Sequence, residues 1–300
     1  MSIFTFWIIF RFNNILELLN KPNKIYSILA LSFCPAFILG HNIMLDIPLL
    51  ALLLEFTYWI LNYNCSSKKS FLLSSVFISI SILIKYTGAF LIGNLIIKIL
   101  FKKKLINIFW LLIPISTVLL WSLFNLYDVG DIHLLMLPSK PIWFYKYFES
   151  FVGFFLVFGC ISPFLSILLY DKYNINKNPY KKIFIAILIL ISILVPVLIV
   201  LNIFLSINEI LINKIFFVVF FVNGVVIFYL LFEQILKKII NLDIYLNDVY
   251  LIYWIATLSF VSIFLAPFLA SRHLILIYPA ILLIFNFKFI EFKNKKNIYL

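Results

Sequence analysis

The stretch His41-Asn42-Ile43-Met44-Leu45-Asp46-Ile47-Pro48 decides the fold, because it places a carboxylate between two long apolar runs. Apolar residues extend from Ile25 to Gly40 before it and from Leu49 to Leu61 after it. A bare carboxylate in lipid is costly, so Asp46 is expected at a membrane boundary or inside a protein-lined cavity. Pro48 suits the first turn of a helix, and Asp46 just before it can cap that helix. Asp46 is therefore either a cap at the water interface or a functional residue.

The composition predicts a polytopic helical membrane protein. Of the 300 residues, 65% are hydrophobic and only 12% are charged, and the mean hydropathy is +1.13. These values lie far outside the range of soluble domains. The chain has no internal repeat and no low-complexity linker, so residues 1–300 are treated as a single transmembrane domain.

Apolar runs predict an all-α bundle of about ten or eleven membrane spans. The runs lie at 2–19, 25–43, 47–63, 70–84, 87–101, 105–127, 150–170, 183–205, 214–235, 248–267 and 273–289. Two of them, 70–84 and 87–101, are short for a full crossing, so we expect them to tilt or to pair as a helical hairpin.

The distribution of basic residues predicts the orientation of the bundle. If the spans alternate in direction, most of the 24 Lys and Arg residues fall on one side. They are at positions 21, 24, 68, 69, 102–104, 172, 177, 181, 182, 237, 238, 288, 293, 295 and 296. The positive-inside rule places this side in the cytoplasm and the amino terminus outside. The net charge of +12 is thus a topology signal and indicates attraction to anionic membrane lipids, not to nucleic acid.

The same alternation places eight other charged or histidine residues on the outer side. The residues come from four separate loops and include all three histidines: His41, Asp46, Lys85, Asp128, Asp131, His133, Arg272 and His273. We therefore expect an extracytoplasmic site. The segment from Tyr127 to Glu149, with its prolines and aromatic residues, is expected to be the longest outer loop.

Two cations on the outer side suggest an anionic lipid ligand. The Lys85 ammonium and the Arg272 guanidinium are suited to hold a phosphate whose lipid tail lies in the bilayer. The alternative for Lys85 is a lysine that simply extends to the water interface. Glu55, within the run 47–63, either lines a cavity or pairs with another span.

Candidate metal-binding pairs and catalytic motifs give weaker evidence about function than the two cations do. Asp46 with His41, or Asp131 with His133, are candidate ligands for a divalent cation or groups that polarise an acceptor hydroxyl. No Walker loop, HExxH, GxSxG or CxxC occurs, which argues against cytosolic nucleotide use, zinc proteolysis and serine hydrolysis.

Four segments resemble a family of membrane glycosyltransferases with the GT-C fold. They are Leu31-Ser32-Phe33-Cys34-Pro35, His41 to Leu49, Ile84-Lys85-Tyr86-Thr87-Gly88, and Ser271-Arg272-His273-Leu274 with Tyr278-Pro279. The chain is similar to glycosyltransferase family 39 and the aminoarabinose transferase-like branch, often labelled dolichyl-phosphate-mannose protein mannosyltransferase. The similarity covers most of the chain in the same order.

The resemblance implies transfer of a sugar from a polyprenyl-phosphate donor to an acceptor on the outer face. It gives Asp46 the family's acidic position and a catalytic role. It makes His41, Lys85, Arg272 and His273 substrate-binding residues. The chain departs from the family in starting within the span that follows the first outer loop, so the family's principal catalytic acid is expected to be missing. The rival interpretation is a lipid-linked oligosaccharide transporter or a non-catalytic membrane partner, in which the same cations only hold the lipid.

Overall fold

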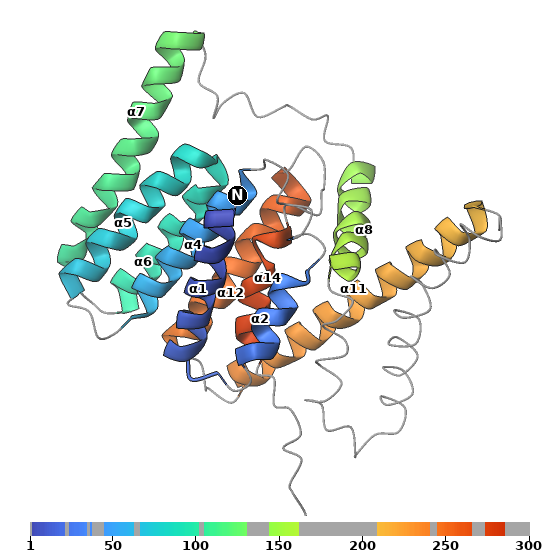
Figure 1. Ribbon diagram of the computed structural model, residues 1–300. Coiled ribbons are helices and arrows are strands. Elements are labelled where there is room, and N and C mark those ends of the chain that lie inside the picture. Colours follow the sequence, from blue (N-terminus) through green and yellow to red (C-terminus); the bar gives the residue numbers. More distant parts are fainter. Residues whose placement is uncertain are drawn as a thin grey trace, which may run out of the picture.

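All regular elements in the described ranges are helices, as the sequence predicts. The computed structural model describes residues 2–21, 24–34, 37, 45–62, 67–101, 105–130, 144–161, 209–240, 245–265 and 274–285. These ranges contain ten α-helices (Figure 1). They are α1 (Ser2–Leu18), α2 (Lys24–Ser32), α4 (Asp46–Leu61), α5 (Ser67–Ile84), α6 (Leu91–Phe101), α7 (Leu112–Val129), α8 (Phe144–Ile161), α11 (Glu209–Ile240), α12 (Leu246–Phe260) and α14 (Tyr278–Ile284). Two 3₁₀ segments, η1 (Tyr86–Phe90) and η2 (Leu105–Leu111), and one π segment, η4 (Val261–Leu265), continue neighbouring helices.

Most predicted spans that fall within the described residues correspond to observed helices, with two differences. Helix α8 begins at Phe144, inside the segment that was expected to be a loop up to Glu149. Helix α14 has only seven residues, because Pro279 starts it after a turn in which the Ile277 N–H bonds the Leu274 carbonyl. The predicted span 183–205 lies outside the described residues.

The described part of the chain contains three helices long and apolar enough to cross a membrane, by length and composition. They are Ile106–Val129, Phe216–Ile240 and Leu246–Phe264. A helix needs about 20 apolar residues to cross a bilayer. Three such helices in one chain indicate a multi-pass membrane protein.

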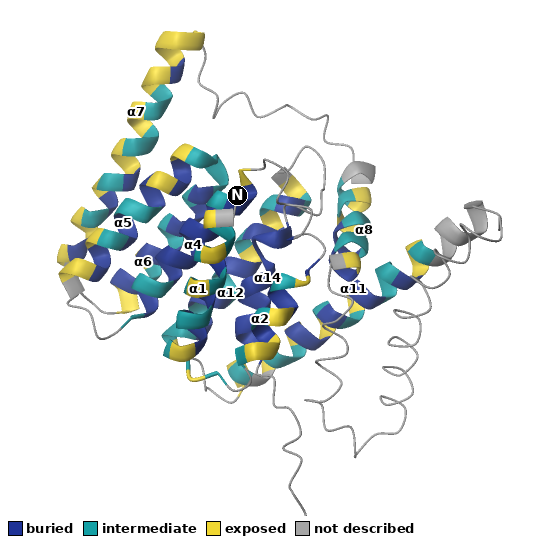
Figure 2. Cartoon of the chain, in the orientation of Figure 1, coloured by how far each residue is buried: buried dark blue, intermediate teal, exposed yellow. Residues whose placement is uncertain are grey.

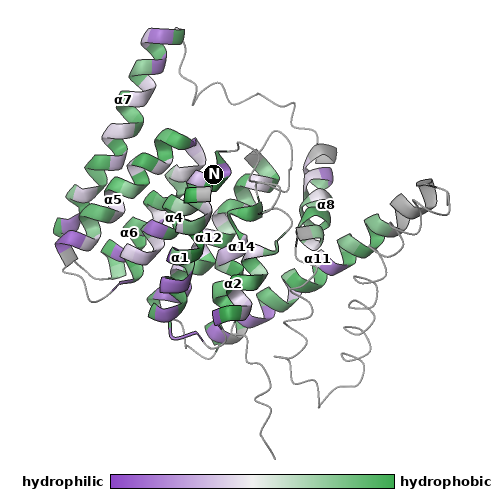
Figure 3. Ribbon diagram, viewed as in Figure 1, coloured by the Kyte–Doolittle hydropathy of each residue, from purple (hydrophilic) through white to green (hydrophobic). Residues whose placement is uncertain are grey.

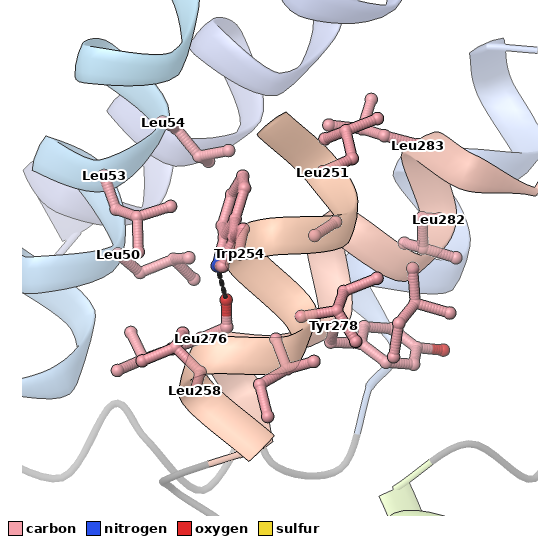
Figure 4. Close-up of a cluster of buried hydrophobic side chains, with 14 of the residues drawn as sticks. Leu50, Leu53, Leu54, Leu251, Trp254, Leu258, Leu276, Tyr278, Leu282 and Leu283 are labelled. Carbon is pink, nitrogen blue, oxygen red and sulfur yellow. Dashed lines mark hydrogen bonds between the residues drawn. The ribbon is translucent and has the colours of Figure 1, made fainter. Parts of the chain in front are cut away.

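The buried core is built around α4. Almost every side chain of this helix is buried, and it packs against α1 and α5 (Figure 2). Leu50, Leu53 and Leu54 of α4 lie beside Trp254 of α12 (Figure 4). The Trp254 Nε1 donates a 2.9 Å hydrogen bond to the Leu276 carbonyl, which ties α12 to the turn before α14. A helix that is apolar on all sides is typical of a bundle centre.

Helix α7 lies at the edge of the bundle and presents an apolar surface. Leu119, Leu120, Leu123 and Phe124 are all more than half exposed. In water such a surface would be unstable, but in a bilayer it is matched by the lipid chains. Helix α7 ends at Gly130, whose positive φ of 79° gives the left-handed C-terminal conformation that favours glycine.

Helices α8 and α11 pack closely through two glycines. A Cβ on Gly159 would lie 1.8 Å from the Phe220 carbonyl oxygen, and a Cβ on Gly224 would lie 1.9 Å from the Phe155 carbonyl oxygen. The Asn223 Nδ2 donates to the Gly159 carbonyl at 2.9 Å. Small residues allow two backbones to approach within a membrane, where lipid exclusion contributes little to association.

Replacing Gly224 with Ala should destabilise this helix pair. The new methyl group cannot fit unless the two backbones separate, so we expect the free energy of unfolding to fall by about 1–3 kcal/mol. Thermal unfolding of the purified protein in detergent measures the change. Val225→Ala, on the neighbouring and more exposed position, is the matched control and should cost less than about 0.5 kcal/mol. Equal stabilities of Gly224→Ala and wild type would show that the close approach does not hold the pair.

Candidate functional site

The structure brings Asp46 and Lys85 together. The Lys85 Nζ donates to the Asp46 Oδ1 at 2.7 Å, although the two residues are 39 positions apart in the chain. Asp46 is only 3% exposed, whereas the Lys85 side chain is 29% exposed. The lysine is therefore the member of the pair that an approaching ligand meets first.

The position of Lys85 follows from a break between α5 and η1. Lys85 adopts an extended backbone, with φ −159° and ψ 132°, and its carbonyl accepts the Gly88 N–H at 2.8 Å. A Cβ on Gly88 would lie 2.7 Å from the Ser81 backbone carbon, so only glycine lets η1 fold back against α5. The turn thus fixes the lysine beside the first residue of α4.

Two neighbouring polar groups extend the site. The Tyr86 hydroxyl accepts a 3.0 Å hydrogen bond from the Asn125 Nδ2, which joins η1 to α7. The Thr87 hydroxyl is buried and has no hydrogen-bond partner among the described residues. A buried hydroxyl without a partner, two residues from Lys85 in the chain, is a candidate donor to a bound ligand.

Asp46 does not cap α4, contrary to one of the two sequence interpretations. It is the first residue of the helix, the cap position belongs to Leu45, and no side chain bonds the helix end there. The Asp46 carboxylate instead pairs with Lys85. A negative charge in the first turn still interacts favourably with the helix dipole.

Most of the other residues predicted for the outer side lie outside the described ranges. His41, Arg272 and His273, together with Asp131 and His133, lie outside the described residues. Asp128 is described, and it is exposed near the end of α7. Within the described ranges, no three His, Cys, Asp or Glu side chains come together as a metal-binding group. Divalent-cation binding by the His41 or His133 pairs stays a prediction.

Comparisons with known proteins assign no family. A scan against protein-family models, a search of curated proteins and a search of solved structures find no match. The resemblance to membrane glycosyltransferases stays an expectation, and the site is described by its geometry alone.

Glu55 pairs with another helix, which is one of the two alternatives that the sequence left open. Both of its carboxylate oxygens bind the Arg11 guanidinium of α1. Trp7 and Trp59 each donate an indole N–H to it, at 2.8 and 2.9 Å. The Arg11 guanidinium also lies 4.3 Å from the centre of the Tyr58 ring, a cation–π distance. Four donors satisfy this carboxylate, so it is a structural ion pair between α1 and α4.

Lys98 is a buried cation that sequence reasoning did not single out. Its side chain, in α6, donates 2.7 Å hydrogen bonds to the Ile60 carbonyl at the end of α4 and to the Ser70 hydroxyl of α5. A positive charge at a helix C-terminus is favourable. The signal available in the sequence was a lysine within the apolar run 87–101.

A second charged cluster lies where α1, α11 and α12 end or begin. Lys238 of α11 forms an ion pair with Asp248 in the first turn of α12. Lys21 follows α1, where Asn20 takes a left-handed conformation and the Lys21 N–H closes the helix on the Leu16 carbonyl. Burial and the nearby charge of Lys238 lower the pKa of Lys21 from 10.5 to about 8, and Asp248 opposes this shift.

Replacing Lys85 should reduce the free energy of unfolding more than replacing Asp46 does. Lys85→Met leaves a buried carboxylate without its cation, and we expect a cost of about 3 kcal/mol. Asp46→Asn leaves a lysine that can turn to water, and we expect about 1 kcal/mol. Chemical unfolding of the purified variants in detergent measures both. A larger loss for Asp46→Asn than for Lys85→Met would contradict the burial of the carboxylate.

The lowered pKa of Lys21 predicts a pH dependence of stability. Between pH 8 and 10.5 the unfolded chain carries a proton on Lys21 that the folded chain has lost, so stability rises with pH in this window. In Lys21→Met this contribution is absent. Raising the pH from 7.5 to 10 also changes the charge of other groups, which the two proteins share. The unfolding temperature of the wild type at pH 10, relative to its value at pH 7.5, should therefore be higher than the same difference for Lys21→Met. Identical pH responses would show that Lys21 titrates as an ordinary surface lysine.

Proposed function

We propose that the chain is a membrane glycosyltransferase that moves a sugar from a polyprenyl-phosphate donor to a lipid, glycan or protein acceptor on the extracytoplasmic face. The observation that carries the proposal is the contact between Asp46 and Lys85. It joins a buried acid and a partly exposed cation at one end of α4 and α5, in a chain with three helices long and apolar enough to cross a membrane.

The donor phosphate would bind at Lys85. The donor is a phosphodiester with one negative charge, and this charge can pair with the Lys85 ammonium. The polyprenyl phosphate that leaves is a monoester with additional negative charge, so the ammonium binds the leaving group more strongly than it binds the donor. The buried Thr87 hydroxyl, two residues along η1, is an additional donor to such an anion. Because the lipid tail of the donor stays in the bilayer, its phosphate arrives at the depth of a helix end.

Asp46 would then act on the acceptor. When Lys85 turns to the phosphate, the Asp46 carboxylate is left to hold the acceptor O–H or N–H. The acceptor oxygen or nitrogen attacks the anomeric carbon and gives its proton to the Asp46 carboxylate. The bond from that carbon to the phosphate oxygen breaks, and the polyprenyl phosphate leaves with the electron pair. Lys85 stabilises the charge that develops on the leaving phosphate. Arg272 and His273, outside the described residues, are proposed to bind the same group.

The distribution of charge supports the orientation. Lys21 and Lys238 lie together at helix ends, whereas Asp46 and Lys85 balance each other at the beginning of α4. The positive-inside rule assigns the lysine-rich end to the cytoplasm. The Asp46 end is then extracytoplasmic.

Transfer assays with Asp46→Asn test the proposal. Purified protein is incubated with a panel of polyprenyl-phosphate sugars, and release of polyprenyl phosphate is measured. We expect the wild type to transfer one of these sugars and Asp46→Asn to lose at least about 100-fold in rate while remaining inserted in membranes. Asp128→Asn, a matched change at an exposed acid, should keep the wild-type rate.

Two outcomes would contradict the proposal. Transfer by Asp46→Asn at the wild-type rate would remove Asp46 from the site. Donor binding that depends on Lys85, without any transfer, would instead favour the lipid-linked oligosaccharide transporter or a non-catalytic partner.

A further inference from the structure

The cluster of Lys21, Lys238 and Asp248 has more positive than negative charge. Asp248 is the partner of Lys238 through its Oδ1, and its Oδ2 accepts the Tyr245 N–H at the start of α12. Among the described residues, no carboxylate lies within ion-pair distance of the Lys21 ammonium. In the described part of the chain, Asp248 is thus ion-paired with Lys238 and not with Lys21, and the same carboxylate also closes a helix end.

The two lysines are held in place by the fold. The left-handed turn at Asn20 fixes Lys21 against the end of α1, and Lys238 is in the last turn of α11. Their charges are close enough to interact, and burial together with this repulsion makes the protonated form of Lys21 costly. A ligand with a negative charge at this position would relieve both the repulsion and the burial cost.

The depth of the cluster matches the headgroup region of a bilayer. Lys238 lies two residues before the end of the candidate span Phe216–Ile240, and Asp248 lies two residues after the start of the candidate span Leu246–Phe264. Figure 3 shows hydrophilic residues at the foot of α1 and where α11 meets α12, with apolar helix between the ends. Phosphate groups of lipids lie at the level where spans leave the hydrocarbon.

Apolar side chains a few positions along the chain from the members of the cluster are exposed. Ile240 at the end of α11 is 73% exposed, Ile25 near the start of α2 is 70% exposed, and Tyr245 before α12 is 70% exposed. Tyrosine is typical of the interface between headgroups and acyl chains. A ligand with a phosphate and hydrocarbon chains would cover both the cations and this apolar surface.

We propose that Lys21 and Lys238 form a binding site for the phosphate of an anionic glycerophospholipid, at the opposite end of the bundle from Asp46 and Lys85. The phosphodiester of a lipid such as phosphatidylglycerol bridges the two ammonium groups, and its chains lie against Ile25 and Ile240. Lys24, three residues after Lys21, differs from Lys21 in having a carboxylate partner among the described residues, because it pairs with Glu17 at 3.3 Å.

Lipid dependence of stability tests the site. The purified protein is placed in nanodiscs of phosphatidylcholine alone or with phosphatidylglycerol, and both thermal unfolding and lipid retention in native mass spectrometry are measured. We expect phosphatidylglycerol to stabilise the wild type, and Lys21→Met to weaken its retention about fivefold, the effect of one basic residue near an anionic surface. Lys21→Arg should retain it. Folding of Lys21→Met is expected, because the change removes a charge that is costly to bury.

The controls separate this site from other sources of binding. Lys24→Met removes the same charge from the same segment and should leave lipid retention unchanged. An equal loss in Lys24→Met would show general attraction to the surface and overturn the proposal. Inorganic phosphate added to phosphatidylcholine nanodiscs should give little protection, and protection equal to that of phosphatidylglycerol would reassign the site to a soluble anion. No stabilisation by either would also overturn it. None of these results depends on sugar transfer.

Discussion

The structure depends on one constraint, namely that a charge among apolar helices must have a partner within the protein. Glu55 shows this most completely, because Arg11, Trp7 and Trp59 together supply four donors to its two oxygens. An unpaired carboxylate at that position would be very costly in a low-dielectric medium. The ion pair therefore fixes how α1 lies against α4, much as Lys98 fixes the end of α4 against α5 and α6.

The two charged clusters at the helix ends differ from these structural pairs in their exposure and balance. Lys85 reaches the surface while its partner Asp46 is buried, so the pair can open toward an anion without leaving the lysine desolvated. The cluster of Lys21 and Lys238 has a surplus of positive charge that the described residues do not neutralise. We propose a lipid phosphate at both places for the same reason, since its hydrocarbon chains remain in the bilayer while its charge reaches a helix end.

The sequence predicted many features of the fold and part of the candidate site. Alternation of apolar runs placed Asp46 and Lys85 on the same side, and the structure brings them into contact. The interpretation of Asp46 as a helix cap was wrong, because α4 begins at Asp46 itself and the carboxylate bonds Lys85. The start of α8 at Phe144 was also missed, since loop-like prolines and aromatic residues masked a helix that continues toward the apolar run. The predicted roles of His41, Arg272 and His273 stay predictions.

The sequence by itself determined that the chain is helical and built for a membrane, because hydropathy and the length of apolar runs are local properties of the chain. It could not determine the partner of each charge. Glu55 and Arg11 are 44 positions apart, and Lys98 and Ser70 are 28 apart. Such pairs form only when helices pack in one register and the side chains reach across the interface. Tertiary packing alone therefore decided that Glu55 is structural, that Lys98 joins three helices, and that Asp46 lies beside Lys85.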